Sequence, residues 1–313
     1  MTKLKVEKHI DIKGREAGLI SNAISDVIKE FTMRAQVKKL KTLRIFITNN
    51  PVEVCKVIIS KVKLNRHSEM REWICQNAPS FSYWEEGQVP TIMLDANQTV
   101  FKEGNYPAIK GLLAHELMHL VNRLDGIDDA LEVEAEKAGK NMFNYLTKIK
   151  NSKTFTRERL LSSLIRLTAT TLFFIKDILA NTRAMSFGFD DEIYYNYKVS
   201  LEGVKKQIKF TEKGIIKSLR SGRKHALDDA FIIYVGLNSS WVTFKMFHNE
   251  LYRELKDMAN IEVPPIIKKN GDSVLEELLN LRSASDKKQL AKILRLSQQN
   301  YFNVVQYFSK KVR

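Results

Sequence analysis

Cysteine is almost absent from this sequence. The chain of 313 residues contains two, Cys55 and Cys75, which are too few for a disulfide framework or a four-thiolate metal site. Six prolines and 13 glycines exclude the collagen-like and low-complexity classes. Because 44% of the residues are hydrophobic and 28% are charged, the chain can bury a core, and wholesale disorder is excluded.

A long uncharged hydrophobic run is also missing. The most apolar stretch, residues 160–180, contains Arg166, Lys176 and Asp177, whereas a membrane-spanning helix needs about 20 largely uncharged residues. We therefore expect a buried core helix there and no membrane span. The first nine residues are polar and mixed in charge, so no signal peptide is expected. The predicted location is the cytoplasm, where the two cysteines stay reduced.

Acidic residues are fewer than basic ones, 36 against 51, which gives a formal net charge of +15. Residues 151–313 hold 28 basic and 17 acidic side chains, a net +11, whereas residues 1–150 hold 23 and 19, a net +4. This excess favours an anionic partner for the second half. The basic clusters are short and carry no recognition motif of nucleic-acid-binding proteins, and a solvated lysine-rich surface is the commoner explanation. They are Lys205-Lys206, Arg220–Lys224 and Lys268-Lys269.

The hydrophobic pattern of the first half predicts both helices and strands. The expected helices cover 17–40, 107–124 and Asp128 or Asp129 to about residue 148, and the expected strands cover 44–48 and 88–95. Pro90 indicates that the second strand lies at a sheet edge, because proline cannot donate a backbone hydrogen bond. Residues 52–63 are compatible with helix or strand, and helix is weakly favoured.

The second half has an almost purely helical pattern. Helices are expected over 156–185, 195–220, 224–259, 272–282 and 286–309. The fold class is therefore α+β and predominantly helical, with a small mixed sheet in the first half followed by an all-α C-terminal region. The pattern changes near residue 152, which predicts two domains, 1–152 and 153–313.

Two of the six histidines stand four residues apart, in His115-Glu116-Leu117-Met118-His119. Residues i and i+4 lie on one face of a helix, so both imidazoles can reach a single ion. This is the H-E-x-x-H motif, in which two histidines bind zinc and the glutamate acts as general base. The neighbouring leucines make the helix apolar enough for a core, where unpaired polar groups are costly. A solvated His/Glu face is the alternative.

A catalytic zinc ion requires a third protein ligand beside His115 and His119 and one open position. Asp125 is one candidate, six residues after His119, in a pattern similar to that of the metzincins. Asn122 stands where those proteins have glycine; asparagine tolerates left-handed backbone geometry, but less well. Glu132 on the following helix is the other candidate and the favoured one.

The block Glu132-Val-Glu-Ala135-Glu136 resembles the E-x-x-A-D or E-x-x-A-N block of the gluzincin zinc metallopeptidases. In that family the third ligand is a glutamate on a helix beside the motif helix. Glu136 replaces the usual Asp or Asn, which leaves the hydrogen bond to a ligating histidine unassigned. Glu134 and Glu136 are the fallback ligands, and Glu132 also fits a capping box with Asp129 as the N-cap. The likeness covers about residues 40–150, and the whole chain is also similar to compact archaeal predicted metallopeptidases.

This resemblance implies an intracellular zinc metallopeptidase with Zn²⁺ as cofactor, a peptide or protein as substrate, and Glu116 activating a zinc-bound water. It also implies an edge strand that pairs with an extended substrate, and residues 89–95 are the candidate, although an ordinary edge strand is equally compatible. A donor to the developing oxyanion is expected as well. The candidate substrate-binding residues are Ile92, Met93, Leu94 and Arg183, and Tyr194, Tyr195 and Tyr197 are further candidate donors, each more commonly structural.

A second class of function remains open. The basic helical half can be a module that binds nucleic acid or an acidic protein, with the zinc site structural or vestigial. A third interpretation combines the two, with the helical half recognising the target of the peptidase. The sequence leaves the oligomeric state and the substrate open.

Overall fold

The computed structural model describes most of the chain. The described residues are 4–34, 40–54, 80–84, 88–148, 155–205, 208–223, 225–247, 249–281 and 286–312. Cys55, Cys75 and most of segment 52–63, for which helix was weakly favoured, lie outside these ranges.

The chain forms two compact units that divide at other positions than the sequence pattern predicts. The first, here called the sheet unit, comprises Met1–Asp125 and Ala180–Ser200. The second, the helical unit, comprises Gly126–Leu179 and Leu201–Arg313. A single boundary near residue 152 therefore does not describe this division, because 126–152 belong to the helical unit and 180–200 to the sheet unit.

The sheet unit contains a small mixed sheet with the strand order β1-β2-β4-β3. Its strands are β1 (Lys5–Ile10), β2 (Thr42–Thr48), β3 (Ser80–Tyr83) and β4 (Thr91–Asp95). β1, β2 and β4 are parallel, and β3 runs antiparallel to β4. The mixed sheet is as predicted, although β1 and β3 carry no strong strand pattern of their own.

β4 lies inside the sheet, so the prediction that residues 88–95 form an edge strand is wrong. Its register pairs Ile92 with Ile45 of β2 on one side and with Ser82 of β3 on the other. Pro90 precedes the first residue of the strand, and its carbonyl accepts the backbone N–H of Arg44 at 2.9 Å. Proline is tolerated there because that position donates no ladder hydrogen bond. Among the strands of the described residues, β3 is the end strand on this side.

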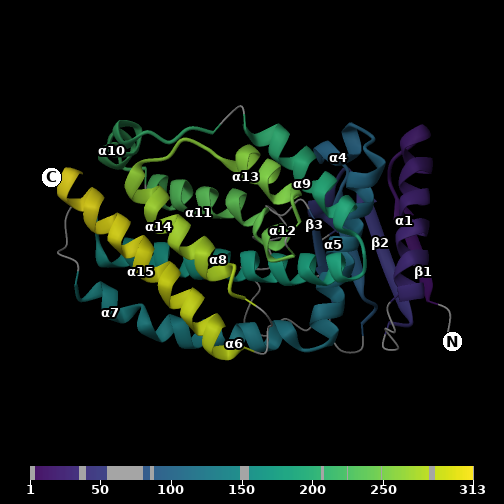
Figure 1. Ribbon diagram of the computed structural model, residues 1–313, viewed down its shortest axis with the longest axis horizontal. Coiled ribbons are helices and arrows are strands. Elements are labelled where there is room, and N and C mark those ends of the chain that lie inside the picture. The colour runs from purple at the N-terminus through teal and green to yellow at the C-terminus, as the bar shows by residue number, and fades with distance from the viewer. Residues whose placement is uncertain are drawn as a thin grey trace. The chain divides into compact units, whose positions relative to one another are not determined.

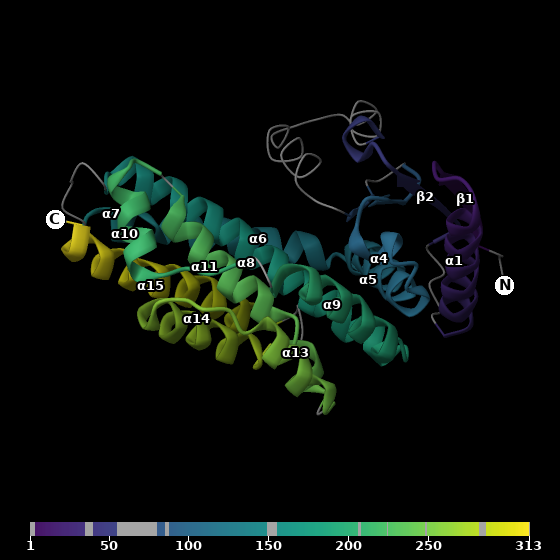
Figure 2. The same ribbon diagram turned by 90° about the horizontal axis from the view of Figure 1, so that it is seen from above.

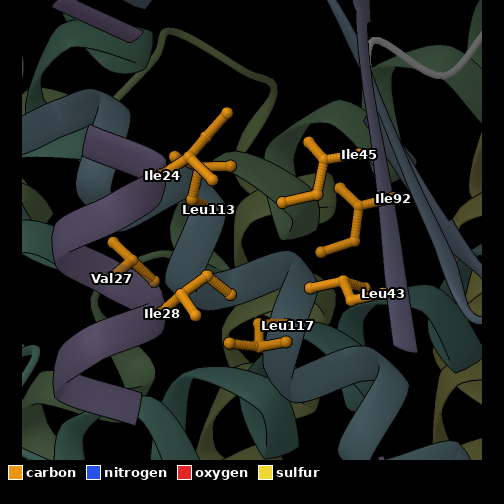
Figure 3. Close-up of a pocket in the computed structure, with 8 residues that line it drawn as sticks. All are labelled: Ile24, Val27, Ile28, Leu43, Ile45, Ile92, Leu113 and Leu117. Carbon is orange, nitrogen blue, oxygen red and sulfur yellow. The ribbon is translucent and has the colours of Figure 1, made fainter. Parts of the chain in front are cut away.

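Two long helices, α1 (Arg15–Arg34) and α5 (Tyr106–Leu124), pack against each other in the sheet unit. Figure 3 shows aliphatic side chains of both helices facing those of the strands. Together they line a small enclosed space: Ile24, Val27, Ile28, Leu43, Ile45, Ile92, Leu113 and Leu117. Every side chain of this set is apolar, so this region is hydrophobic core and fixes α5 in the unit.

The ends of α5 follow the signals in the sequence. Asn105 is the N-cap, and its side chain accepts the backbone N–H of Ala108 at 3.1 Å. Pro107 stands in the first turn, where a missing N–H is harmless. Gly126 follows the helix with φ of 74°, a left-handed conformation that glycine adopts without strain. A short helix, α4 (Thr99–Lys102), precedes α5.

The helical unit is a set of packed helices. They are α6 (Ile127–Asn141), α7 (Phe143–Leu146), the first part of α8 (Arg157–Ser186), α10 (Glu212–Arg220), α11 (Ala226–Ser239), α12 (Val242–Met246), α13 (Leu251–Ala259), α14 (Pro265–Leu278) and α15 (Lys287–Val312). Figures 1 and 2 show α14 beside α11 and α15. α9 (Asp190–Lys205) lies mostly in the sheet unit. The predominantly helical α+β class is confirmed.

The long expected helices differ in their outcome. The prediction over 156–185 is confirmed by α8, and that over 286–309 by α15. The expected helix 224–259 is interrupted twice, between α11 and α12 and again between α12 and α13. Among the helices of the described residues, none combines the length and apolar content that a membrane span requires.

Candidate metal centre

Helix α5 brings the Nε2 atoms of the two motif histidines close together. The Nε2 atoms of His115 and His119 are 3.0 Å apart, and the ring centroids are 4.5 Å apart with the rings nearly perpendicular. A tetrahedral zinc ion with Zn–N distances near 2.0–2.1 Å holds two nitrogen ligands about 3.3 Å apart. The two ring nitrogens thus converge to nearly the separation that one shared ion demands, and this donor set fits zinc.

The outer nitrogen of His115 faces an amide. His115 Nδ1 lies 2.7 Å from Oδ1 of Asn181, and Asn181 Nδ2 donates to the hydroxyl of Tyr197 at 2.6 Å. An amide oxygen can only accept, so Nδ1 of His115 carries the proton in this arrangement. The neutral ring then presents the Nε2 lone pair toward His119, which is the tautomer that ligates a metal through Nε2.

Glu116 is buried, with 4% of its surface exposed. The Ser80 hydroxyl, at the first residue of β3, donates to Glu116 Oε1 at 2.6 Å. A hydrogen bond from a hydroxyl holds the carboxylate in one orientation. The buried carboxylate and the two converging ring nitrogens thus belong to one helix, α5.

Asp125, the candidate third ligand nearest the motif, is engaged elsewhere. Arg183 Nη2 lies 2.6 Å from Asp125 Oδ2, and Arg183 Nη1 donates to Asn122 Oδ1 at 2.9 Å. The guanidinium therefore ties the end of α5 to the last turn of α8. Oδ2 of Asp125 and both terminal nitrogens of Arg183 are thus engaged with each other or with Asn122.

The α5 helix approaches α9 very closely at Gly111. A Cβ atom at Gly111 would lie 2.0 Å from the carbonyl oxygen of Glu192. One residue before, Lys110 pairs with Glu30 at 2.9 Å and with Glu192 at 3.0 Å. Burial lowers the pKa of Lys110, but its hydrogen bonds to the two glutamates outweigh this effect and the pKa is raised overall. This contact fixes α9, which carries Tyr197, beside the motif helix.

The glutamates expected to supply the third ligand lie on α6, in the helical unit. Glu132 and Glu136 are exposed, and Glu134 is buried and paired with Lys137 at 2.7 Å. The expected capping box is absent, because the N-cap of α6 is Gly126 and Asp129 stands inside the first turn. No contact within either unit tests Glu132 as a ligand, which stays a prediction.

The expected substrate strand is corrected by the position of β4. Ile92, Met93 and Leu94 are buried, and the backbone of their strand pairs with β2 and β3. Strand addition needs unpaired backbone groups at an edge, so these three residues cannot accept a substrate in that way.

The three tyrosines offered as donors lie on α9 in different surroundings. Tyr194 is buried, Tyr195 is exposed, and Tyr197 contacts Asn181.

Asp177 and Asn181 are functional candidates that the sequence analysis did not select. They stand four residues apart on α8, a continuous helix, so both lie on one face of it, one turn apart. Because the helix is unbroken, helix geometry determines where Asp177 lies relative to Asn181. The available signal was a pair of polar residues at helical spacing where the apolar stretch 160–180 ends, with Asp177 inside it and Asn181 directly after it. Ser80 had no such signal.

Comparison of the chain with protein-family models, with curated proteins and with solved structures finds no match.

Proposed function

We propose that this protein is a zinc-dependent peptidase whose centre is built on α5. The observation that carries the proposal is the convergence of the His115 and His119 Nε2 atoms to 3.0 Å beside the buried Glu116. A solvated His/Glu face does not account for it, because Glu116 is buried and His115 is hydrogen-bonded to a buried amide. The proposed location is the cytoplasm, as expected from the sequence.

His115 and His119 would hold the metal ion through Nε2. When bound, zinc lowers the pKa of a coordinated water and polarises a carbonyl group. The Asn181 amide keeps Nδ1 of His115 protonated, so the Nε2 lone pair is directed at the ion. The donors are two neutral nitrogens, and a carboxylate would complete the protein ligands of a catalytic site.

Asp177 is our proposed third ligand. It lies one turn before Asn181 on the same face of α8, and Asn181 contacts His115. Asp125 is less suited because Arg183 holds its carboxylate. Glu132, favoured by the sequence, is the alternative.

Glu116 would act as the general base. Its carboxylate accepts a proton from water as the water attacks the peptide carbonyl, and then donates that proton to the leaving amine. Ser80 orients the carboxylate through the 2.6 Å hydrogen bond to Oε1. Of the described strands on this side of the sheet, β3 is the outermost, so β3 replaces residues 89–95 as the proposed strand for an extended substrate.

The proposal is tested by the Glu116→Gln variant of the full chain. Glutamine keeps the size of the side chain and loses the base, so cleavage of a peptide library is expected to fall at least a thousandfold with zinc content unchanged. A chelator should abolish cleavage by the wild type, and added zinc should restore it. Wild-type cleavage rates in Glu116→Gln would refute the peptidase.

A second candidate function rests on a basic hollow of the helical unit. Its lining comprises α10 and the end of α15: Lys213, Ile216, Lys217, Arg220, Ser221 and Lys311. Glu212 neutralises part of this charge through its 2.6 Å contact with Lys311. Such a surface favours an acidic protein or a nucleic acid. Binding of a labelled polyanion that weakens steeply with salt and ignores chelator would support this candidate; the absence of binding at low salt would exclude it.

A further inference from the structure

Asn181 stands in an unusual position for a polar side chain. It is 1% exposed, and both ends of its amide are engaged. Oδ1 contacts Nδ1 of His115 at 2.7 Å, and Nδ2 donates to Tyr197 at 2.6 Å. A buried amide costs stability unless it is hydrogen-bonded, so a side chain that spans two partners has a defined orientation.

The partner that holds Asn181 is itself fixed to the motif helix. Tyr197 lies on α9, which contacts α5 through the close approach at Gly111 and the Lys110–Glu192 ion pair. Asn181 lies on the last part of α8, which joins α9 through a turn at Gly188 with φ of 78°. The hairpin formed by α8 and α9 therefore contacts α5 at two places. α9 contacts it at Lys110 and Gly111, and Asn181 of α8 contacts it at His115. Rotation of the amide would place NH₂ against Nδ1–H and break the hydrogen bond to His115.

We infer that Asn181 is a positioning residue that prepares His115 for metal binding, with Tyr197 holding its amide in the required orientation. This inference rests on the proposed function. The Asn181 oxygen selects the Nδ1-protonated tautomer and fixes the plane of the ring, so the metal-binding nitrogen is oriented before the ion arrives. From the sequence, the hydrogen bond to a ligating histidine stays unassigned, because Glu136 replaces the Asp or Asn that supplies it in the gluzincins.

The test measures binding of Zn²⁺ alone to the full chain by competition with a chromophoric chelator. Asn181→Leu keeps the side-chain size and removes the acceptor, so the Kd for zinc is expected to rise 10- to 100-fold, the usual effect of losing such a partner. Asn181→Asp keeps an oxygen for His115 and accepts from the Tyr197 hydroxyl, so it should remain within about threefold of the wild type. Tyr197→Phe should give an intermediate loss.

Thr182→Val is the matched control. Thr182 is the next residue of α8, and its hydroxyl is buried without a hydrogen-bond partner among the described residues. This substitution should leave the Kd within about twofold of the wild type. Thermal unfolding of each metal-free variant separates loss of folding from loss of metal binding, and the absorption spectrum with Co²⁺ reports whether the coordination geometry changes.

The outcomes distinguish the inference from the proposed function. If the wild type fails to bind zinc, both are wrong. If the wild type binds zinc and Asn181→Leu binds it equally well, the inference is wrong and the peptidase proposal stands. If Asn181→Leu does not fold, Tyr197→Phe decides, and an unchanged Kd in that variant overturns the inference.

Discussion

The Glu116 carboxylate is oriented by a hydroxyl from a distant segment. Ser80 lies 36 residues earlier in the chain and donates to Oε1 at 2.6 Å. A hydrogen bond to a charged group contributes about 1.5–3 kcal/mol where the group is buried. Part of that energy serves to hold the proposed base in its reactive orientation.

Substitution of Ser80 by alanine should therefore lower kcat for peptide cleavage by about 10-fold, while zinc content and Kd for zinc stay unchanged. The reason is that the Ser80 hydroxyl donates to the proposed base. Steady-state kinetics with metal analysis measures both quantities. Ser82→Ala in the same strand is the matched control and should keep the wild-type kcat. A loss of zinc in Ser80→Ala would contradict this role.

At the scale of elements, α1 and α5 are joined by two polar contacts at helical spacing on α5. The Tyr106 hydroxyl donates to Asp26 at 2.5 Å, and Lys110 pairs with Glu30. Burial and the hydrogen bond to Asp26 raise the pKa of Tyr106 to about 12. The pKa of Lys110 is also raised. Both folded-state values thus lie above those of the unfolded chain, about 10 for tyrosine and 10.4 for lysine.

These shifts predict a loss of stability at alkaline pH. A group whose pKa is raised by folding stabilises the native state below its unfolded pKa, and this stabilisation disappears as the pH rises through the folded value. The thermal midpoint of the wild type should therefore fall between about pH 10 and pH 12. Tyr106→Phe and Asp26→Asn should both show a shallower fall over this range, since each removes the Tyr106–Asp26 hydrogen bond. An equally steep fall in both variants would contradict this explanation.

The elements were predictable where a local signal sets them. The capping residue and proline of α5 and the apolar periodicity of α8 and α15 are local, and these helices form as expected. No local signal shows whether 88–95 lies at the edge of the sheet. β3 pairs with β4, and β3 comes from a segment that carries little strand pattern. The capping box at Asp129 failed because Gly126, with positive φ, starts α6 three residues earlier.

At the scale of the whole molecule, the candidate site is assembled from segments far apart in sequence. Ser80, the motif helix, Asn181 and Tyr197 all belong to the sheet unit, whose two chain segments are 1–125 and 180–200. The sequence predicted the three motif residues, since their spacing is sufficient. It could not predict that Ser80 and Asn181 lie beside the motif residues, because those contacts depend on tertiary packing. α8 has one unbroken periodicity, so no local signal marks the change of unit within it.

The positive net charge of the molecule favours an anionic partner, but it does not indicate the chemistry of the proposed metal centre. The net +11 of residues 151–313 includes the basic hollow formed by α10 and the end of α15. The proposed base and the two proposed histidine ligands lie in the other unit, whose surrounding sequence is close to neutral. A peptidase with a basic recognition surface accommodates both observations.

The metal content of the purified full chain tests the central claim most directly. Native mass spectrometry after incubation with Zn²⁺ and removal of excess metal should show one zinc ion per chain in the wild type. Zinc should be lost in His115→Ala, His119→Ala and Asp177→Asn, and retained in Asp125→Asn and Glu132→Gln. Loss in Glu132→Gln with retention in Asp177→Asn would move the third ligand to α6. A wild-type chain without zinc, or undiminished zinc in His119→Ala, would contradict the proposed metal centre.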